Sequence, residues 1–208
     1  SRNNAQYGLL MHICELLFHE LMPDTQDGSR RFLGIAQDQI RMSALFEDFL
    51  RKFYDIELAE GSARAEIMAW DATSPTPADL GYLPVMKTDI TIRLPGRVIV
   101  IDAKYYPSHL VRNQFGSERL ISGHLYQLST YLAHVGLRED TDQISGMLIY
   151  PQNGEPVELH YQMLGYPVTI ASIDLSAPWA DIHDRLLLLA RHSGPEPQVY
   201  AATATRFG

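Results

Sequence analysis

Two aspartates and a lysine are the residues of this chain whose types and spacing predict chemistry. Asp89 opens one apolar run, Asp102 closes the next, and Lys104 lies two residues beyond it. Two carboxylates held close together repel each other unless a cation lies between them or one is protonated. A hard divalent ion with oxygen ligands, Mg²⁺ or otherwise Mn²⁺, resolves that repulsion. An ammonium on the same face can polarise a phosphoryl oxygen or orient a water.

A β-hairpin is the element that would gather these residues. Apolar side chains recur at every second position over residues 90–94 and 98–103, which is the period of a strand. Between the two runs, Pro95 fixes φ and Gly96 tolerates a positive φ, as a tight turn requires. Pairing symmetric about this turn matches isoleucines with isoleucines: Ile90 with Ile101 and Ile92 with Ile99. The same register places Asp89 across from Asp102, with Cβ atoms roughly 5 Å apart.

Three observations bear on this interpretation, two against it and one in its favour. A Pro-Gly turn suits the twist of a two-residue hairpin poorly, so a longer loop or a bulge would shift the register by one residue. An Asp-x-Lys sequence also ends many surface hairpins by chance. Against this, Val98–Ile101 is purely apolar, which is typical of a buried central strand. A charge at the end of such a strand needs a partner or a function.

Composition predicts one ordinary globular domain. The chain has 208 residues, 46% of them hydrophobic and 20% charged, and we expect a single domain over 1–192 with a helical N-terminal part. The tail over 193–208 is expected to be loosely ordered. Cys14 is the only cysteine, which excludes a disulfide framework, and no apolar run has membrane-spanning length. A cytoplasmic location is predicted.

The net charge of −8 argues against a protein that grips nucleic acid unaided, because Lys and Arg neutralise phosphate in such binding. Carboxylates gathered around a metal, or a partner that supplies affinity, would remove this objection. The most basic and amide-rich segment near the aspartates contains Arg112, Asn113, Arg119 and His124. It is predicted either to contact DNA phosphates or to be a solvated loop.

Periodicity predicts a mixed β-sheet flanked by helices, an α/β fold. Helices are expected over 7–21, 37–54, 118–135 and 179–191. Strands are expected over 64–70, the two arms of the hairpin, 144–150, 157–163 and 168–173, with a proline-rich loop over 74–80.

The motifs in this order resemble a known superfamily. They are Phe46-Glu47-Asp48-Phe49, Asp89, Asp102-Ala103-Lys104-Tyr105, Gln127-Leu128-Ser129-Thr130-Tyr131 and Leu148-Ile149-Tyr150-Pro151. This set resembles the PD-(D/E)xK nucleases, and most of all the McrC-like nuclease subunits of 5-methylcytosine-specific restriction systems. The resemblance implies a restriction-endonuclease-like core and a Mg²⁺-dependent DNA endonuclease that works with an McrB-like GTP-hydrolysing AAA+ partner.

The resemblance also implies roles for single residues. It assigns metal binding to Asp89, Asp102 and Glu47, and catalysis to Lys104 with Gln127 and Tyr131. Spacing supports the last two independently, since residues i and i+4 share a helical face. A structural role is the alternative for each of these three residues. Gln127 and Tyr131 would then be polar residues at the margin of the core, and Glu47 would form an ordinary ion pair with Arg51.

The chain departs from the family pattern in two ways. Thr88 precedes Asp89 where the superfamily has proline, although a metal needs only the carboxylate. McrC-like proteins usually carry an additional N-terminal domain for the partner, and a chain that begins at Ser1 without methionine suggests a segment of a longer protein. Three alternatives stay open: a non-catalytic module that keeps the nuclease fold, a RecB-like nuclease acting on DNA ends, and a homodimer that cuts both strands.

Overall fold

The computed structural model describes residues 31–105, 110–112 and 118–193, with side chains over 40–105 and 120–193. The predicted helix over 7–21, with Cys14, and the tail beyond 193 lie outside these residues. The helices are α2 (Arg31–Glu57), α3 (Ser122–Gly136) and α4 (Trp179–His192), with a short 3₁₀ helix, η1 (Pro77–Tyr82). The strands are β1 (Ser62–Arg64), β2 (Ile67–Met68), β3 (Met86–Lys87), β4 (Ile90–Leu94), β5 (Arg97–Ala103), β6 (Leu110–Arg112), β7 (Glu118–Leu120), β8 (Ile144–Pro151), β9 (Glu158–Met163) and β10 (Tyr166–Ile173).

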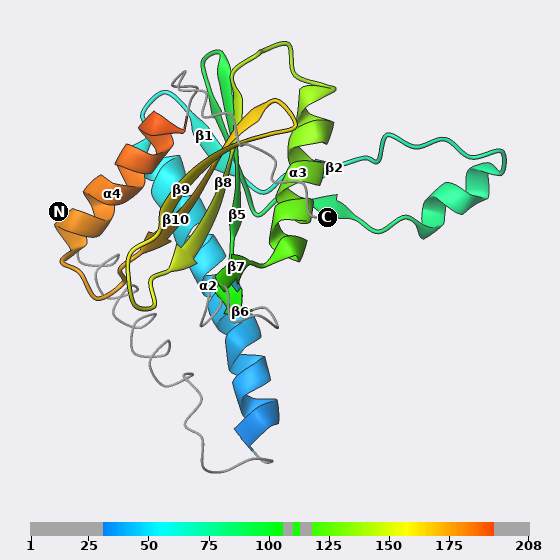
Figure 1. Ribbon diagram of the computed structural model, residues 1–208. Coiled ribbons are helices and arrows are strands. Elements are labelled where there is room, and N and C mark those ends of the chain that lie inside the picture. Colours follow the sequence, from blue (N-terminus) through cyan, green and yellow to red (C-terminus); the bar gives the residue numbers. More distant parts are fainter. Residues whose placement is uncertain (1–30, 106–109, 113–117, 194–208) are drawn as a thin grey trace, which may run out of the picture.

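A mixed six-stranded sheet forms the centre of the molecule, in the order β1-β4-β5-β8-β10-β9. Strands β5, β8 and β10 are parallel to one another, whereas β1, β4 and β9 add antiparallel partners at the two sides. Because β5 and β8 are parallel, the chain must cross over between them, and α3 lies in that crossover. The predicted α/β fold with a mixed, helix-flanked sheet is confirmed (Figure 1).

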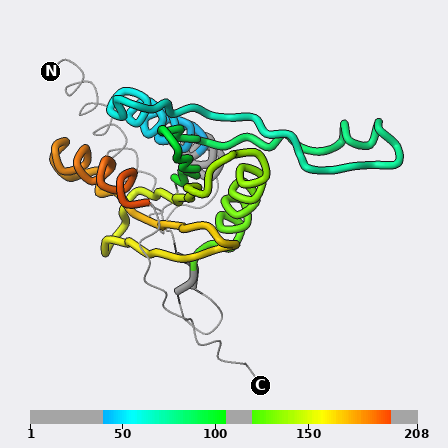
Figure 2. Tube along the Cα trace, turned by 90° about the horizontal axis from the view of Figure 1, so that it is seen from above, coloured from blue at the N-terminus to red at the C-terminus, as the bar shows by residue number. Residues whose placement is uncertain are grey.

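Helices cover both faces of the sheet. On one face α2 and α4 bury Phe46 and Leu186 against Ile101, and on the other α3 buries Leu128 against Val100. Successive residues of a strand point to opposite faces, so β5 contributes alternately to the two clusters. Figure 2 shows α3 on one side of the sheet, and α2 and α4 on the other. Asp102 has the parity of Val98 and Val100, and it therefore faces the α3 layer.

The central hairpin has the predicted register. Ile90 pairs with Ile101 and Ile92 with Ile99, across the two-residue connection Pro95-Gly96. Gly96 has a φ of 69°, in the left-handed region that glycine adopts without a Cβ penalty. The unfavourable twist of a Pro-Gly turn therefore does not shift the pairing.

Two predicted elements differ in the structure. The strand expected over 64–70 is divided, with β1 on the main sheet and β2 paired with β3 in a separate ladder. The helix expected from Glu118 begins at Ser122, because the backbone of Glu118–Leu120 pairs antiparallel with Leu110–Arg112. A backbone already paired in a ladder has no need of helical hydrogen bonds.

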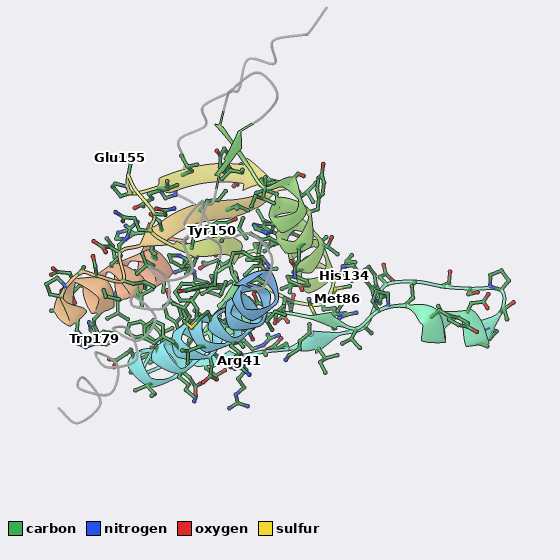
Figure 3. All side chains as sticks on the ribbon, turned by 90° about the horizontal axis from the view of Figure 1, so that it is seen from below. Arg41, Met86, His134, Tyr150, Glu155 and Trp179 are labelled. Atoms are coloured by element: carbon green, nitrogen blue, oxygen red, sulfur yellow. The ribbon has the colours of Figure 1, made fainter. Side chains whose placement is uncertain are left out.

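An arm of chain between β2 and β3 extends away from the body in both views (Figures 1 and 2). The expected proline-rich loop lies in it and contains η1, which has proline in its first turn and buries no residue. The base of the arm is attached to α3, where the Trp70 and His134 rings lie 5.6 Å apart. Figure 3 shows Met86 and His134 at this base. Among the described residues, no helix combines the length and apolar character needed to cross a membrane.

Close packing of α3 on β8 depends on Gly146. A Cβ added there would lie 2.8 Å from Leu132 Cδ1 and 3.1 Å from Leu128 Cδ2, and both leucines are buried. We expect Gly146→Ala to lower the unfolding free energy by about 1–2 kcal/mol, because the helix must shift outward. Urea unfolding followed by circular dichroism measures the change. Gly123→Ala is the matched control, since nothing lies within 4 Å of its added Cβ; equal stability of the two variants would contradict this packing.

Candidate active site

Asp89 and Asp102 meet at the open end of the central hairpin. Asp102 is the sixth residue of β5 and is completely buried, while Asp89 directly precedes β4. The Oδ2 atom of Asp89 accepts a hydrogen bond from the Ala103 backbone N–H at 2.9 Å. That bond turns the Asp89 carboxylate across the hairpin toward β5, as the predicted register requires.

The environment of Asp102 opposes its ionisation. Burial, together with the negative charge of Asp89, raises the pKa of Asp102 to about 8, although the Lys104 ammonium acts in the opposite direction. Neither oxygen of Asp102 accepts a hydrogen bond from the described residues. The compensation there is an ion pair, with Asp102 Oδ1 2.9 Å from Lys104 Nζ. A buried carboxylate with unfilled acceptor sites is costly unless a cation is close to it.

Lys104 starts a chain of polar contacts along α3. Its Nζ donates to Gln127 Oε1 at 2.9 Å, and Gln127 Nε2 donates to the Tyr131 hydroxyl at 2.8 Å. Tyr131 in turn donates its O–H to the Lys87 carbonyl oxygen at 2.7 Å. These contacts hold the Lys104 ammonium directly beside Asp102. Only 14% of the Lys104 side chain is exposed. The structure therefore brings together Asp89, Asp102, Lys104, Gln127 and Tyr131.

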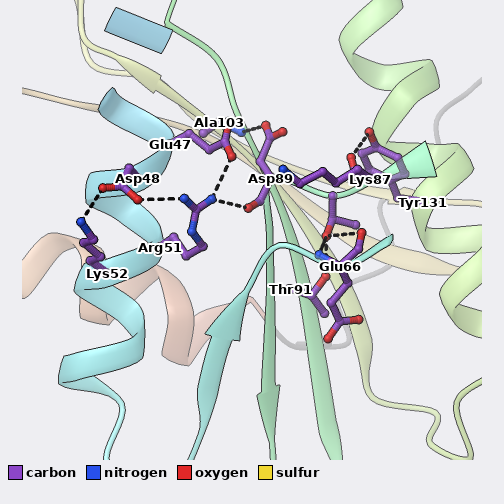
Figure 4. Close-up of polar contacts among 11 residues, drawn as sticks. Glu47, Asp48, Arg51, Lys52, Glu66, Lys87, Asp89, Thr91, Ala103 and Tyr131 are labelled. Atoms are coloured by element: carbon purple, nitrogen blue, oxygen red, sulfur yellow. Dashed lines mark hydrogen bonds and ion pairs between the residues drawn. The ribbon is translucent and has the colours of Figure 1, made fainter. Parts of the chain in front are cut away.

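Glu47 lies on α2, the helix that covers the opposite face of the sheet from α3. Its Oε1 accepts from Arg51 Nη1 at 2.9 Å, and the same nitrogen donates to the Asp89 carbonyl oxygen at 3.3 Å. Glu47 thus reaches the neighbourhood of Asp89 through a guanidinium (Figure 4). In the described part of the chain, no three His, Cys, Asp or Glu side chains are grouped closely enough to hold a metal ion. The structure does not bring Glu47 into one ligand set with the two aspartates.

Thr88, which directly precedes Asp89, makes hydrogen bonds that a proline could not make. Its backbone N–H donates to the Glu66 carbonyl at 2.9 Å, and proline has no N–H. Its hydroxyl accepts from the Glu66 N–H at 3.0 Å and contacts the Thr91 hydroxyl at 2.9 Å. The segment leading into Asp89 is fixed by hydrogen bonds rather than by a ring.

The predicted DNA-contacting residues are only partly described. Asn113 lies outside the described residues, and Arg112 and Arg119 lie on β6 and β7 with side chains outside them. His124 is buried, with Nδ1 2.9 Å from the Tyr150 hydroxyl. Burial, helped by the charge of Lys104, lowers the pKa of His124 to about 4. The imidazole is therefore neutral at pH 7 and offers a phosphate no ionic attraction.

Three contacts near the site were not predicted from the sequence: the Lys87 carbonyl with Tyr131, Arg51 with Asp89, and Tyr150, which the sequence analysis named only within a motif, with His124. Tyr150 lies two residues beyond Leu148, the parallel partner of Asp102, and hence on the same face. The alternation of side chains along β8 predicts which face of the sheet Tyr150 occupies. That this face lies beside Asp102 follows only from the pairing of β5 with β8, which joins segments more than forty residues apart.

The paired carboxylates fit a divalent cation. Asp102 offers two buried oxygens that accept no hydrogen bond from the part of the chain that the structure describes, and Asp89 supplies a second carboxylate beside it. Hard cations prefer such oxygen ligands. Two protein carboxylates leave further coordination positions open to water and substrate, as is common for Mg²⁺.

Fold and site together define an α/β protein with a carboxylate pair and a lysine at one end of a mixed sheet. The chain belongs to the family described as McrBC 5-methylcytosine restriction system component, whose model matches residues 1–151. It is also 33% identical over 186 residues to the type IV methyl-directed restriction enzyme EcoKMcrBC of Escherichia coli (strain K12). That match covers 89% of this chain and 53% of the relative, so the chain spans about half the relative's length.

The raised pKa of Asp102 has a consequence for stability. The folded state keeps the Asp102 proton up to about pH 8, whereas the unfolded chain releases it near the ordinary value of 3.8. Without metal, this residue's contribution to stability is therefore lost as pH rises between these values. We expect Asp102→Asn to raise the unfolding free energy by about 1 kcal/mol or more above pH 8.

Urea unfolding in EDTA, at about pH 5 and about pH 9, measures this effect. The exposed Asp142→Asn is the matched control and should change neither value. If the unfolding free energies of the native chain and Asp102→Asn depended on pH in the same way, the raised pKa of Asp102 would be contradicted.

Proposed function

We propose that this chain is a Mg²⁺-dependent DNA endonuclease with a PD-(D/E)xK-type core, the cleavage component of a McrBC-like restriction system. The observation that carries the proposal is the Asp102–Lys104 pair, buried beside Asp89 and fixed by Gln127. A purely structural role gives no reason to bury the Asp102 carboxylate beside a second carboxylate at such a cost. Membership of the restriction-system family supports the same conclusion.

In this proposal Asp89 and Asp102 hold the cation. A bound Mg²⁺, or Mn²⁺ in its place, supplies Lewis-acid stabilisation of charge on a phosphodiester and lowers the pKa of water. Asp89 and Asp102 would hold this cation between them, and its positive charge would offset their repulsion and favour the ionised form of Asp102.

Lys104 is the residue that would act on the substrate. Its ammonium is buried enough to interact strongly with charge, yet it retains some exposure to incoming phosphate. An ammonium has three N–H donors, and Lys104 gives one of them to Gln127 while its charge pairs with Asp102, so donor capacity remains for a phosphoryl oxygen. Stabilisation of the negative charge that develops during phosphodiester hydrolysis is the expected role.

Recognition of DNA is assigned mainly to other parts of the system. The net charge of −8 opposes unaided binding to a polyanion, and the relative is named for methyl-directed restriction. We therefore propose that an McrB-like AAA+ GTPase brings this chain to DNA, with Arg112, Asn113 and Arg119 as phosphate contacts. Cleavage of both strands by a homodimer stays a prediction, as does the cytoplasmic location.

Plasmid cleavage tests the proposal directly. The native chain with Mg²⁺ and a candidate AAA+ GTPase should nick or linearise methylated plasmid, with unmethylated plasmid as the comparison. Lys104→Ala should reduce the rate at least about 100-fold because it removes a positive charge that acts on the transition state, and Asp102→Ala should do so because it removes a ligand of the proposed cation. Lys52→Ala, on an exposed part of α2, is the control and should retain activity. Equal rates in all four proteins would contradict the nuclease assignment.

Tyr131 is expected to position Gln127 and thereby Lys104. Tyr131→Phe removes the hydroxyl that accepts from Gln127 and donates to the Lys87 carbonyl. We expect cleavage to fall about 10-fold, since a displaced ammonium stabilises charge less well. Tyr126→Phe is the matched control, because Tyr126 lies on the same helix but is 71% exposed. The account is contradicted if both variants cleave at the native rate.

A further inference from the structure

Arg51 connects helix α2 to the candidate active site. Its guanidinium contacts three oxygens: Glu47 Oε1 at 2.9 Å, Asp48 Oδ1 at 2.8 Å and the Asp89 carbonyl at 3.3 Å. Figure 4 shows the Arg51 side chain between α2 and the segment that carries Asp89. Two of these contacts are made within α2, and the third crosses to the start of β4.

The third contact distinguishes Arg51 from an ordinary helix-surface ion pair. Exposed pairs at i,i+3 and i,i+4 spacing contribute little on their own. The guanidinium is about three-quarters buried, however, and its planar fork fixes several acceptors in one geometry. The guanidinium therefore fixes the position of the Glu47 carboxylate relative to the Asp89 backbone.

A carboxylate already neutralised by a guanidinium has little need of a metal ion. A divalent cation bound by Glu47 would also lie close to the positive charge of Arg51, and the two would repel each other. Lys52 does not provide this effect, because its ammonium pairs with Asp48 and is 65% exposed.

We infer that Arg51 withholds Glu47 from metal binding, so that the site takes one divalent ion, held by Asp89 and Asp102. The guanidinium supplies a fixed positive charge beside the Glu47 carboxylate. Arg51 is thus a positioning residue that limits the site to one cation. This inference rests on the proposed function, since it assumes that the two aspartates bind a divalent ion.

Titration with Mn²⁺, followed by the electron paramagnetic resonance signal of the free ion, tests the inference on the full chain without DNA. The native chain should bind one ion, and Arg51→Ala should gain a second, weaker ion. The second ion should be lost again in Arg51→Ala/Glu47→Gln. Arg51→Lys, which keeps a cation beside Glu47, and Lys52→Ala should both bind one ion. Circular dichroism of each variant establishes that it is folded.

The outcomes separate this inference from the proposal on which it rests. Two ions on the native chain, or a single ion on Arg51→Ala, would overturn the role of Arg51 and leave the nuclease assignment standing. No Mn²⁺ on the native chain, or undiminished binding by Asp102→Asn, would overturn the metal site itself and with it the inference.

Discussion

The burial of Asp102 next to a second carboxylate is the constraint on which the arrangement of the site depends. Its side chain has no exposure to solvent, and neither oxygen accepts a hydrogen bond from the described residues. Desolvation and the Asp89 charge both favour the protonated form, and only the Lys104 ammonium opposes them. A protein keeps such a group against its own stability when the group has a function. The neighbouring contacts can be understood as means of holding positive charge at this point.

The fold supplies those contacts from three layers. The central sheet brings the ends of β4 and β5 together, and α3 on one face provides Gln127 and Tyr131, which fix Lys104. On the other face α2 provides Arg51, which reaches the Asp89 backbone. Gly146 in β8 allows α3 to approach closely enough for the first set of contacts. The rigidity of a two-faced core therefore sets the geometry of a small polar cluster at its end.

The part of this arrangement that follows from local sequence was predictable. Alternating isoleucines fixed the hairpin register, and with it the juxtaposition of Asp89 and Asp102, because a slip of one residue would turn Thr91 and Arg93 into the apolar cluster that holds Ile90 and Ile92. The i,i+4 spacing of Gln127 and Tyr131 likewise placed them on one face of α3. These are short-range consequences of strand and helix periods.

Features that depend on long-range packing escaped prediction. From the sequence, His124 was predicted to belong to a basic patch. Its burial could not be predicted, because its contact with Tyr150 depends on the packing of α3 against β8. Glu47 looked like a metal ligand, or one half of a surface pair with Arg51. That pair exists, but Arg51 also contacts Asp89, and this contact requires α2 to pack beside the start of β4. Thr88 similarly owes its place to Glu66, more than twenty residues earlier.

The central claim is that the buried Asp102 carboxylate and its neighbour Asp89 form a cation site. Anomalous diffraction from crystals of this chain soaked in Mn²⁺ would test it most directly, because the signal locates the ion independently of activity. The account predicts one strong peak in contact with carboxylate oxygens of both Asp89 and Asp102, close to Lys104. Occupied Mn²⁺ sites elsewhere, with no peak between these two aspartates, would contradict it.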